Sequence, residues 1–151
     1  MNASYHYRAT ARWTDGRRGV VEGESLGQEA FAFTSPPEFG GPSGRWTPEH
    51  LFVAAVATCF TITFRAIAEF SKFQPLGLEV TAEGVLEKAE GGFQFTRVIL
   101  RPALTIAQES DRERGLRLLE KTERSCLVSR SLKSQVTLEP TLRVANAVAA
   151  A

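Results

Sequence analysis

The feature that most constrains this chain is an apolar stretch from Leu51 to Phe64, preceded by a strong helix start. Thr47 offers an N-cap hydroxyl, Pro48 stands at the first helical position, and Glu49 puts a carboxylate in the first turn. We expect a helix over residues 48–70. Because its first half is apolar on nearly every face, we expect it to be central and buried. A membrane span needs about 20 apolar residues, so the stretch predicts a core helix and no membrane partner.

Short strands are expected before this helix. Residues 5–13 alternate between apolar and polar side chains, which predicts a half-buried strand. Asp15-Gly16 is a turn signal, and further strands are expected at 19–25 and 29–34. Three short consecutive strands of this kind predict an antiparallel meander.

A second group of elements is expected after the helix. We expect strands at 78–88 and 93–106, a helix at 111–124, a short helical turn at 126–132, a last strand at 135–144 and a frayed tail at 145–151. Ser110 and Glu113 have the spacing of a capping box at the start of the second helix. This order predicts an α+β fold in a single domain over residues 1–151, with the sheets covering the helices on one side.

The composition narrows the class of protein. With 18 basic and 17 acidic residues the net charge is +1, and such a balance argues against a nucleic-acid partner. The first residues contain no apolar signal-peptide core. The chain has two cysteines, too few for a disulfide framework. We therefore expect a soluble protein of a reducing compartment, the cytoplasm.

The two cysteines are the candidates for chemistry. Cys59 lies inside the apolar helix, where a free cysteine packs as a small hydrophobe and where its thiolate is disfavoured. A reactive Cys59 would therefore need a cation nearby. Cys126 opens the short helical turn, where backbone N–H groups and the helix dipole favour a thiolate. Each cysteine taken alone is also consistent with a core thiol.

Two other kinds of site do not fit the positions of the histidines and cysteines. A zinc site needs four convergent ligands, but His50 and Cys59 are nine residues apart and face opposite sides of the helix, and His6 has no nearby partner. A cysteine hydrolase needs a base, and neither histidine has the sequence context of one. We expect no metal and no cofactor.

Two motifs together resemble a known family. Thr47-Pro48-Glu49-His50-Leu51-Phe52, running into Ala54-Ala55-Val56-Ala57-Thr58-Cys59-Phe60, is similar to the central helix of the OsmC/Ohr family. These osmotically inducible and organic hydroperoxide resistance proteins are thiol-dependent peroxidases. Ser125-Cys126-Leu127-Val128-Ser129-Arg130-Ser131-Leu132 resembles the second cysteine motif of the family. The expected order of elements also matches, over roughly residues 5–143, and implies an intertwined homodimer with an OsmC-like fold.

The resemblance implies a two-cysteine peroxidase for alkyl or lipid hydroperoxides in oxidative stress defence. Cys59 would attack the peroxide as a thiolate and become a sulfenic acid, and Cys126 would condense with it to a disulfide that a small or protein dithiol reduces. A glutamate and an arginine complete the site in the family. Glu49 matches the glutamate, and Arg17 matches the arginine. Arg18 and Arg45 remain alternatives for the arginine.

The spacing of Glu49 and Cys59 indicates how such a site would be assembled. Ten residues correspond to about 15 Å along a helix axis, which a glutamate side chain does not bridge. If both residues serve one site, Glu49 comes from a partner chain, and the site lies at a homodimer interface. The apolar helix favours a homodimer as well, because one chain offers little to cover it on all sides. The alternative function is a non-catalytic dimer of the same fold that binds an apolar or thiol-reactive ligand.

Overall fold

A computed structural model describes residues 3–25 and 27–145. The chain divides into two compact units, with the boundary between Phe52 and Val53. That the two form one domain stays a prediction. The expected frayed tail at 145–151 lies outside the described residues, apart from Ala145.

The first unit is built on a three-stranded antiparallel sheet. Its strands are β1 (Ala9–Asp15), β2 (Arg18–Gly23) and β3 (Phe31–Thr34), in the order β1-β2-β3. Gly16 has a φ of 49° in the turn between β1 and β2, a conformation that glycine adopts without steric cost. A 3₁₀ turn at Pro37–Phe39 follows β3. The predicted meander is therefore confirmed.

The predicted character of the first strand was wrong. β1 begins at Ala9, so Tyr5 and Tyr7 precede it, and their side chains are 79% and 86% exposed. All seven residues of β1 are exposed, including Trp13. The alternating apolar residues of this segment thus lie on a face that stays exposed among the described residues.

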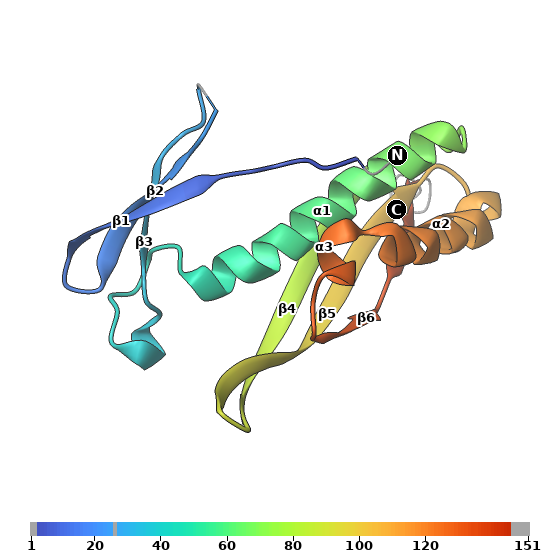
Figure 1. Ribbon diagram of the computed structural model, residues 1–151. Helices are drawn as coiled ribbons and strands as arrows, with labels where there is room; N and C mark the ends of the chain where they lie inside the picture. The colour runs from blue at the N-terminus through green and yellow to red at the C-terminus, as the bar shows by residue number, and fades with distance from the viewer. Residues whose placement is uncertain (1–2, 26, 146–151) are drawn as a thin grey trace. The chain divides into compact units, whose positions relative to one another are not determined.

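The second unit combines three helices with a mixed sheet (Figure 1). Its elements are most of α1 (Pro48–Phe70), then β4 (Gly77–Ala89), β5 (Gly92–Ile106), α2 (Arg112–Ser125), α3 (Leu127–Arg130), β6 (Gln135–Leu138) and β7 (Thr141–Val144). β4 and β5 form an antiparallel hairpin, and both β6 and β7 pair with β5 in parallel. The fold is α+β, as predicted.

The last strand was expected to be continuous and is not. Pro140 separates β6 from β7, and proline has no N–H to give to a ladder. Just before it, the N–H of Glu139 donates to the carbonyl of Leu100 at 2.8 Å. The break therefore follows from one residue in the middle of the predicted strand.

The helices of the second unit pack on one face of this sheet. Every second residue of β5 from Val98 to Ile106 is buried. A Cβ added to Gly84 of β4, opposite Val98, would come within 2.7 Å of Val53 on α1. A Cβ on Gly115 of α2 would lie 3.1 Å from Leu104 on the same face of β5. The core consists of Val56, Phe60, Phe64 and Ala68 from α1, Phe73, then Val98, Leu100, Leu104 and Ile106 from β5, and Leu118, Leu119 and Cys126.

α1 begins and ends where it was predicted to. Thr47 caps it by accepting a hydrogen bond from the N–H of His50 at 3.1 Å. The expected burial was wrong, however, because its buried residues form a single stripe, repeated every four residues from Val56 to Ala68. Ile62, on another face, is 69% exposed.

The length of α1 also corrects the expectation that the apolar segment is too short to cross a membrane. The helix has 23 residues, and an 18-residue window within it has a mean hydropathy of 1.9, which by length and composition permits a span. A core helix meets the same criterion. In this chain 22% of that window is buried, along the stripe that packs on the sheet.

The predicted capping box of α2 does not form. A 3₁₀ turn at Glu109–Asp111 precedes the helix, and the N-cap is Asp111, whose side chain makes no capping hydrogen bond. Glu109 instead binds the guanidinium of Arg112, at 2.6 Å to Nε. The start of α2 therefore has this ion pair, and not the expected reciprocal hydrogen bonds of Ser110 and Glu113.

Candidate functional site

The second unit brings the two cysteines together. Cys59 projects from α1, and Cys126 occupies the single residue between α2 and α3. The backbone of Cys126 is extended, with φ −64° and ψ 112°, so the chain turns sharply there. The two side chains lie within hydrogen-bonding reach of each other, and both cysteines are free.

The surroundings of Cys59 favour its thiolate. Burial raises the pKa of Cys59, but hydrogen bonds outweigh that effect and the pKa lies below its ordinary value. The donors are the N–H of Val128, the side chain of Cys126, the hydroxyl of Thr63 and the N–H of Leu127. Thr63 is one turn further along α1, with its Oγ1 3.9 Å from the Cys59 sulfur. Both backbone donors belong to the first turn of α3, whose N–H groups have no partner within the helix.

The pKa of Cys126 is shifted in the opposite direction, above its ordinary value. Burial raises the pKa of Cys126, and the hydrogen bond with Cys59 and its charge raise it further, while Ser129 opposes the rise. The expectation that Cys126 gains its thiolate from the start of the short helix was therefore wrong. The N–H groups of Leu127 and Val128 act on Cys59 instead. Of the two cysteines, Cys126 is therefore the one whose protonated form is favoured.

The two sulfurs also differ in accessibility. Cys126 is completely buried, whereas Cys59 is partly exposed. An ionised and accessible thiol is a nucleophile, and a buried protonated thiol beside it can supply both a proton and a second sulfur. The pair is therefore suited to two-step thiol redox chemistry.

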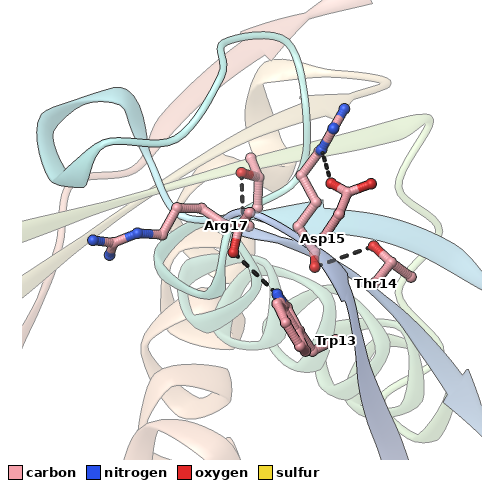
Figure 2. Close-up of polar contacts among 7 residues, drawn as sticks. Trp13, Thr14, Asp15 and Arg17 are labelled. Atoms are coloured by element: carbon pink, nitrogen blue, oxygen red, sulfur yellow. Dashed lines mark hydrogen bonds and ion pairs between the residues drawn. The ribbon is translucent and has the colours of Figure 1, made fainter.

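Arg17 and Arg18 lie in the first unit, at the turn between β1 and β2. Arg18 is held by Asp15, with its Nε 2.7 Å from Oδ1. The carbonyl of Arg17 accepts a hydrogen bond from Thr34 at 3.0 Å, which fixes the backbone of the turn. The Arg17 guanidinium extends away from Asp15 and Trp13 (Figure 2), and among the described residues it has no hydrogen-bond or ion-pair partner. Of these two arginines, Arg18 is thus paired, and Arg17 has no partner within residues 3–25 and 27–145.

Glu49 also belongs to the first unit, in the first turn of α1. Its Oε2 is buried and has no hydrogen-bond partner among the residues that the structure describes. A buried carboxylate oxygen of this kind is costly unless it meets a donor or a cation. Arg45, the third candidate arginine, lines a nearby cavity of about 300 Å³ with Gly44, Trp46 and His50.

Sequence reasoning did not find Thr63 or the N–H groups of Leu127 and Val128. Thr63 had a usable signal, since residues four apart on a helix lie on the same face and Thr63 is four residues after Cys59. The backbone donors had none, because their pairing with Cys59 depends on where α3 lies against α1.

Comparison with known proteins gives consistent matches. Residues 40–141 match the family described as OsmC-like protein. The chain is 30% identical to the uncharacterized protein YmaD of Bacillus subtilis over 140 residues, covering 91% of this chain and 93% of the relative. It is 30% identical to peroxiredoxin OsmC of Escherichia coli over 143 residues, covering 91% and 97%. A solved structure from Legionella pneumophila, titled an organic hydroperoxide resistance protein OsmC, aligns with a TM-score of 0.74 at 29% identity, covering 95% of this chain and all of that one.

Proposed function

The chain belongs to the OsmC-like protein family, and from this membership and its cysteine pair we propose that it is a thiol-dependent peroxidase that reduces organic hydroperoxides. The observation that carries the proposal is the set of donors around Cys59, one of which is the buried thiol of Cys126. The names of the Escherichia coli and Legionella pneumophila relatives support the same class of reaction.

In the first step, the Cys59 thiolate attacks one oxygen of the hydroperoxide. The S–O bond forms as the O–O bond breaks, and the departing alkoxide takes up a proton to leave as an alcohol. Cys59 is thereby oxidised to a sulfenic acid. The partial exposure of Cys59 admits the peroxide, and the donors from α3 and Thr63 favour the ionised sulfur that attacks it.

In the second step, Cys126 attacks the sulfenic sulfur. An S–S bond forms, the S–O bond breaks, and the Cys126 proton leaves with the hydroxide as water. A small or protein dithiol then reduces the disulfide by thiol–disulfide exchange and is itself oxidised. Since this cycle needs a supply of reduced dithiols, we place it in the cytoplasm.

We propose that Arg17 and Glu49 complete the site in a homodimer. Glu49 and Cys59 are ten residues apart on one continuous helix, about 15 Å along its axis, so Glu49 would act on the Cys59 of a partner chain. Arg17 belongs to the same compact unit as Glu49, so the partner would supply both. The free guanidinium of Arg17 would pair with the unsatisfied Glu49 oxygen and bind the leaving peroxide oxygen.

Stopped-flow oxidation tests the proposed reaction. Wild type, Cys59→Ser and Cys126→Ser are mixed with cumene hydroperoxide or hydrogen peroxide, and sulfenic acid and disulfide are followed. We expect wild type to react with cumene hydroperoxide orders of magnitude faster than a free thiol, and Cys59→Ser to lose this reaction. Cys126→Ser should be oxidised once and then stall as a sulfenic acid or become overoxidised.

A wild-type protein that reacts no faster than a free thiol would contradict the peroxidase proposal. The non-catalytic alternative would then stand, with the same fold binding an apolar or thiol-reactive ligand.

A further inference from the structure

The hydroxyl of Ser129 is an unusual group on α3. The residue is 7% exposed, and its Oγ has no hydrogen-bond partner among the described residues. A buried unpaired hydroxyl lowers stability, because its hydrogen bonds to water are lost and nothing replaces them. The neighbouring Ser131 shows the ordinary arrangement, with an exposed hydroxyl that donates to the carbonyl of Leu127 at 2.8 Å.

The position of Ser129 relates it to Cys126. Cys126 is the N-cap of α3, and Ser129 is the third residue of that helix. In this relation the side chain of the cap and the groups of the third helical residue face each other. Cys126 makes no capping hydrogen bond as a thiol. Both the hydroxyl and the N–H of Ser129 nevertheless act to lower the pKa of Cys126, against the larger effect of burial. They therefore favour the Cys126 thiolate, the form that burial disfavours.

During the proposed reaction the negative charge passes from the Cys59 sulfur to the Cys126 sulfur. The pKa of Cys59 is lowered and that of Cys126 is raised, so a negative charge on the reduced pair is favoured on Cys59. Oxidation of Cys59 to a sulfenic acid removes that negative charge. Cys126 must then give up its proton to become the nucleophile, although it is completely buried and has no cation among the groups that shift its pKa.

We propose that the Ser129 hydroxyl donates a hydrogen bond to the Cys126 thiolate as it forms and attacks the Cys59 sulfenic acid. The Cys126 proton leaves with the sulfenic hydroxide as water, the S–O bond breaks and the S–S bond forms. The same donor stabilises the Cys126 thiolate whenever an external dithiol displaces it from the disulfide. This role rests on the proposed peroxidase function and assigns Ser129 to its resolving step.

The test compares Ser129→Ala with wild type in single-turnover oxidation by cumene hydroperoxide. We expect Cys59 to be oxidised at the wild-type rate and the disulfide to form about tenfold more slowly, as for the loss of a hydrogen bond to a charged group. Dimedone should trap more sulfenic acid on Cys59, detected by mass spectrometry. The pH profile of disulfide formation should move to higher pH. The thermal midpoint should stay equal or rise, because no hydrogen bond is removed from the reduced protein.

Ser131→Ala is the matched control, since it removes a hydroxyl from the turn that ends α3 and should leave the rate and pH profile of disulfide formation unchanged. Wild-type disulfide kinetics with an unmoved pH profile in Ser129→Ala would overturn the role of Ser129 while leaving the peroxidase intact. A wild-type protein that forms no sulfenic acid at all would instead overturn the peroxidase function, and this proposal with it.

Discussion

At the scale of single residues, tertiary contacts reverse what the local sequence suggests about the pKa of each thiol: hydrogen bonds do so for Cys59 and burial for Cys126. Cys59 lies in an apolar helix that disfavours charge, yet donors from Thr63 and from the first turn of α3 lower its pKa. Cys126 stands at a helix start that favours charge, yet burial raises its pKa. An acceptor and a donor thiol therefore lie side by side, and each supports the protonation state of the other.

Thr63→Val should raise the pKa of Cys59, because it removes a donor to the thiolate while keeping the size of the side chain. A lowered pKa keeps the thiol ionised as the pH falls, so a raised pKa reduces the thiolate fraction at any pH below it. One hydrogen bond is worth about 1 kcal/mol, which predicts a roughly fivefold slower alkylation of Cys59 on the acid side of its titration. Iodoacetamide rates measured across the pH range check this.

The rates of Thr63→Val and wild type should converge at high pH, where both thiols are ionised. Thr61→Val is the control, since the Thr61 hydroxyl donates to the carbonyl of Ala57 at 2.8 Å and does not act on Cys59. Equal rates for Thr63→Val and wild type across the whole pH range would show that Thr63 does not stabilise the thiolate.

At the scale of elements, α1 has a capped N-terminus, but only part of its surface is covered by other elements. The N–H of His50 in its first turn donates to the Thr47 cap, and Thr47 is almost completely buried. One stripe packs on β4 and β5, whereas Ala55, Thr58, Ile62 and Ala66 form an exposed and uncharged stripe. The residue at which the helix starts is thus determined by neighbouring residues, whereas the burial of each of its faces is determined by the elements that pack on it.

Thr47→Ala should destabilise the protein by about 1 kcal/mol, because the N–H of His50 loses its capping acceptor. Urea unfolding followed by circular dichroism measures the change. Thr58→Ala is the matched control within α1. Its hydroxyl donates to the carbonyl of Ala54 in mid-helix at 2.8 Å, and alanine is the better helix former, so this variant should be neutral or more stable. Equal losses in both variants would contradict the capping role of Thr47.

At the scale of the whole molecule, apolar surface remains uncovered in both units. In the first unit Tyr5, Tyr7 and Trp13 are largely exposed, and in the second unit Ile62 of α1 is. Exposed apolar surface of this kind is typical of protein interfaces. Together with the unsatisfied oxygen of Glu49, it favours the proposed homodimer, in which a second chain covers α1 and supplies the charged residues of the site.

Ile62→Glu should convert the proposed dimer to a monomer, because it puts a charge on the exposed stripe of α1. Analytical ultracentrifugation measures the mass. Peroxidase turnover should fall strongly, since Arg17 and Glu49 of the partner would be lost. Leu76→Glu, at a position 59% exposed outside α1, should change neither. A fully active monomer would rule out the shared site.

The order of elements was predictable because each depends on neighbouring residues. The Thr47-Pro48-Glu49 start gives α1 its boundary, the Asp15-Gly16 turn joins β1 to β2, and Gly91 with Gly92 turns β4 into β5. The two cysteines and Glu49 could be nominated from the resemblance of their motifs. The break between β6 and β7 also had a local cause in Pro140, although a continuous strand was predicted there.

The state of the thiols and the use of the apolar faces depend on residues far apart in the chain. The pKa of Cys59 is lowered by Val128 and Leu127, about seventy positions away, and no spacing rule connects them. The exposure of β1 and of one stripe of α1 likewise depends on which element packs against each of them. Local sequence determines backbone geometry through short-range sterics and hydrogen bonds, whereas electrostatics and burial depend on contacts that exist only after the chain has folded.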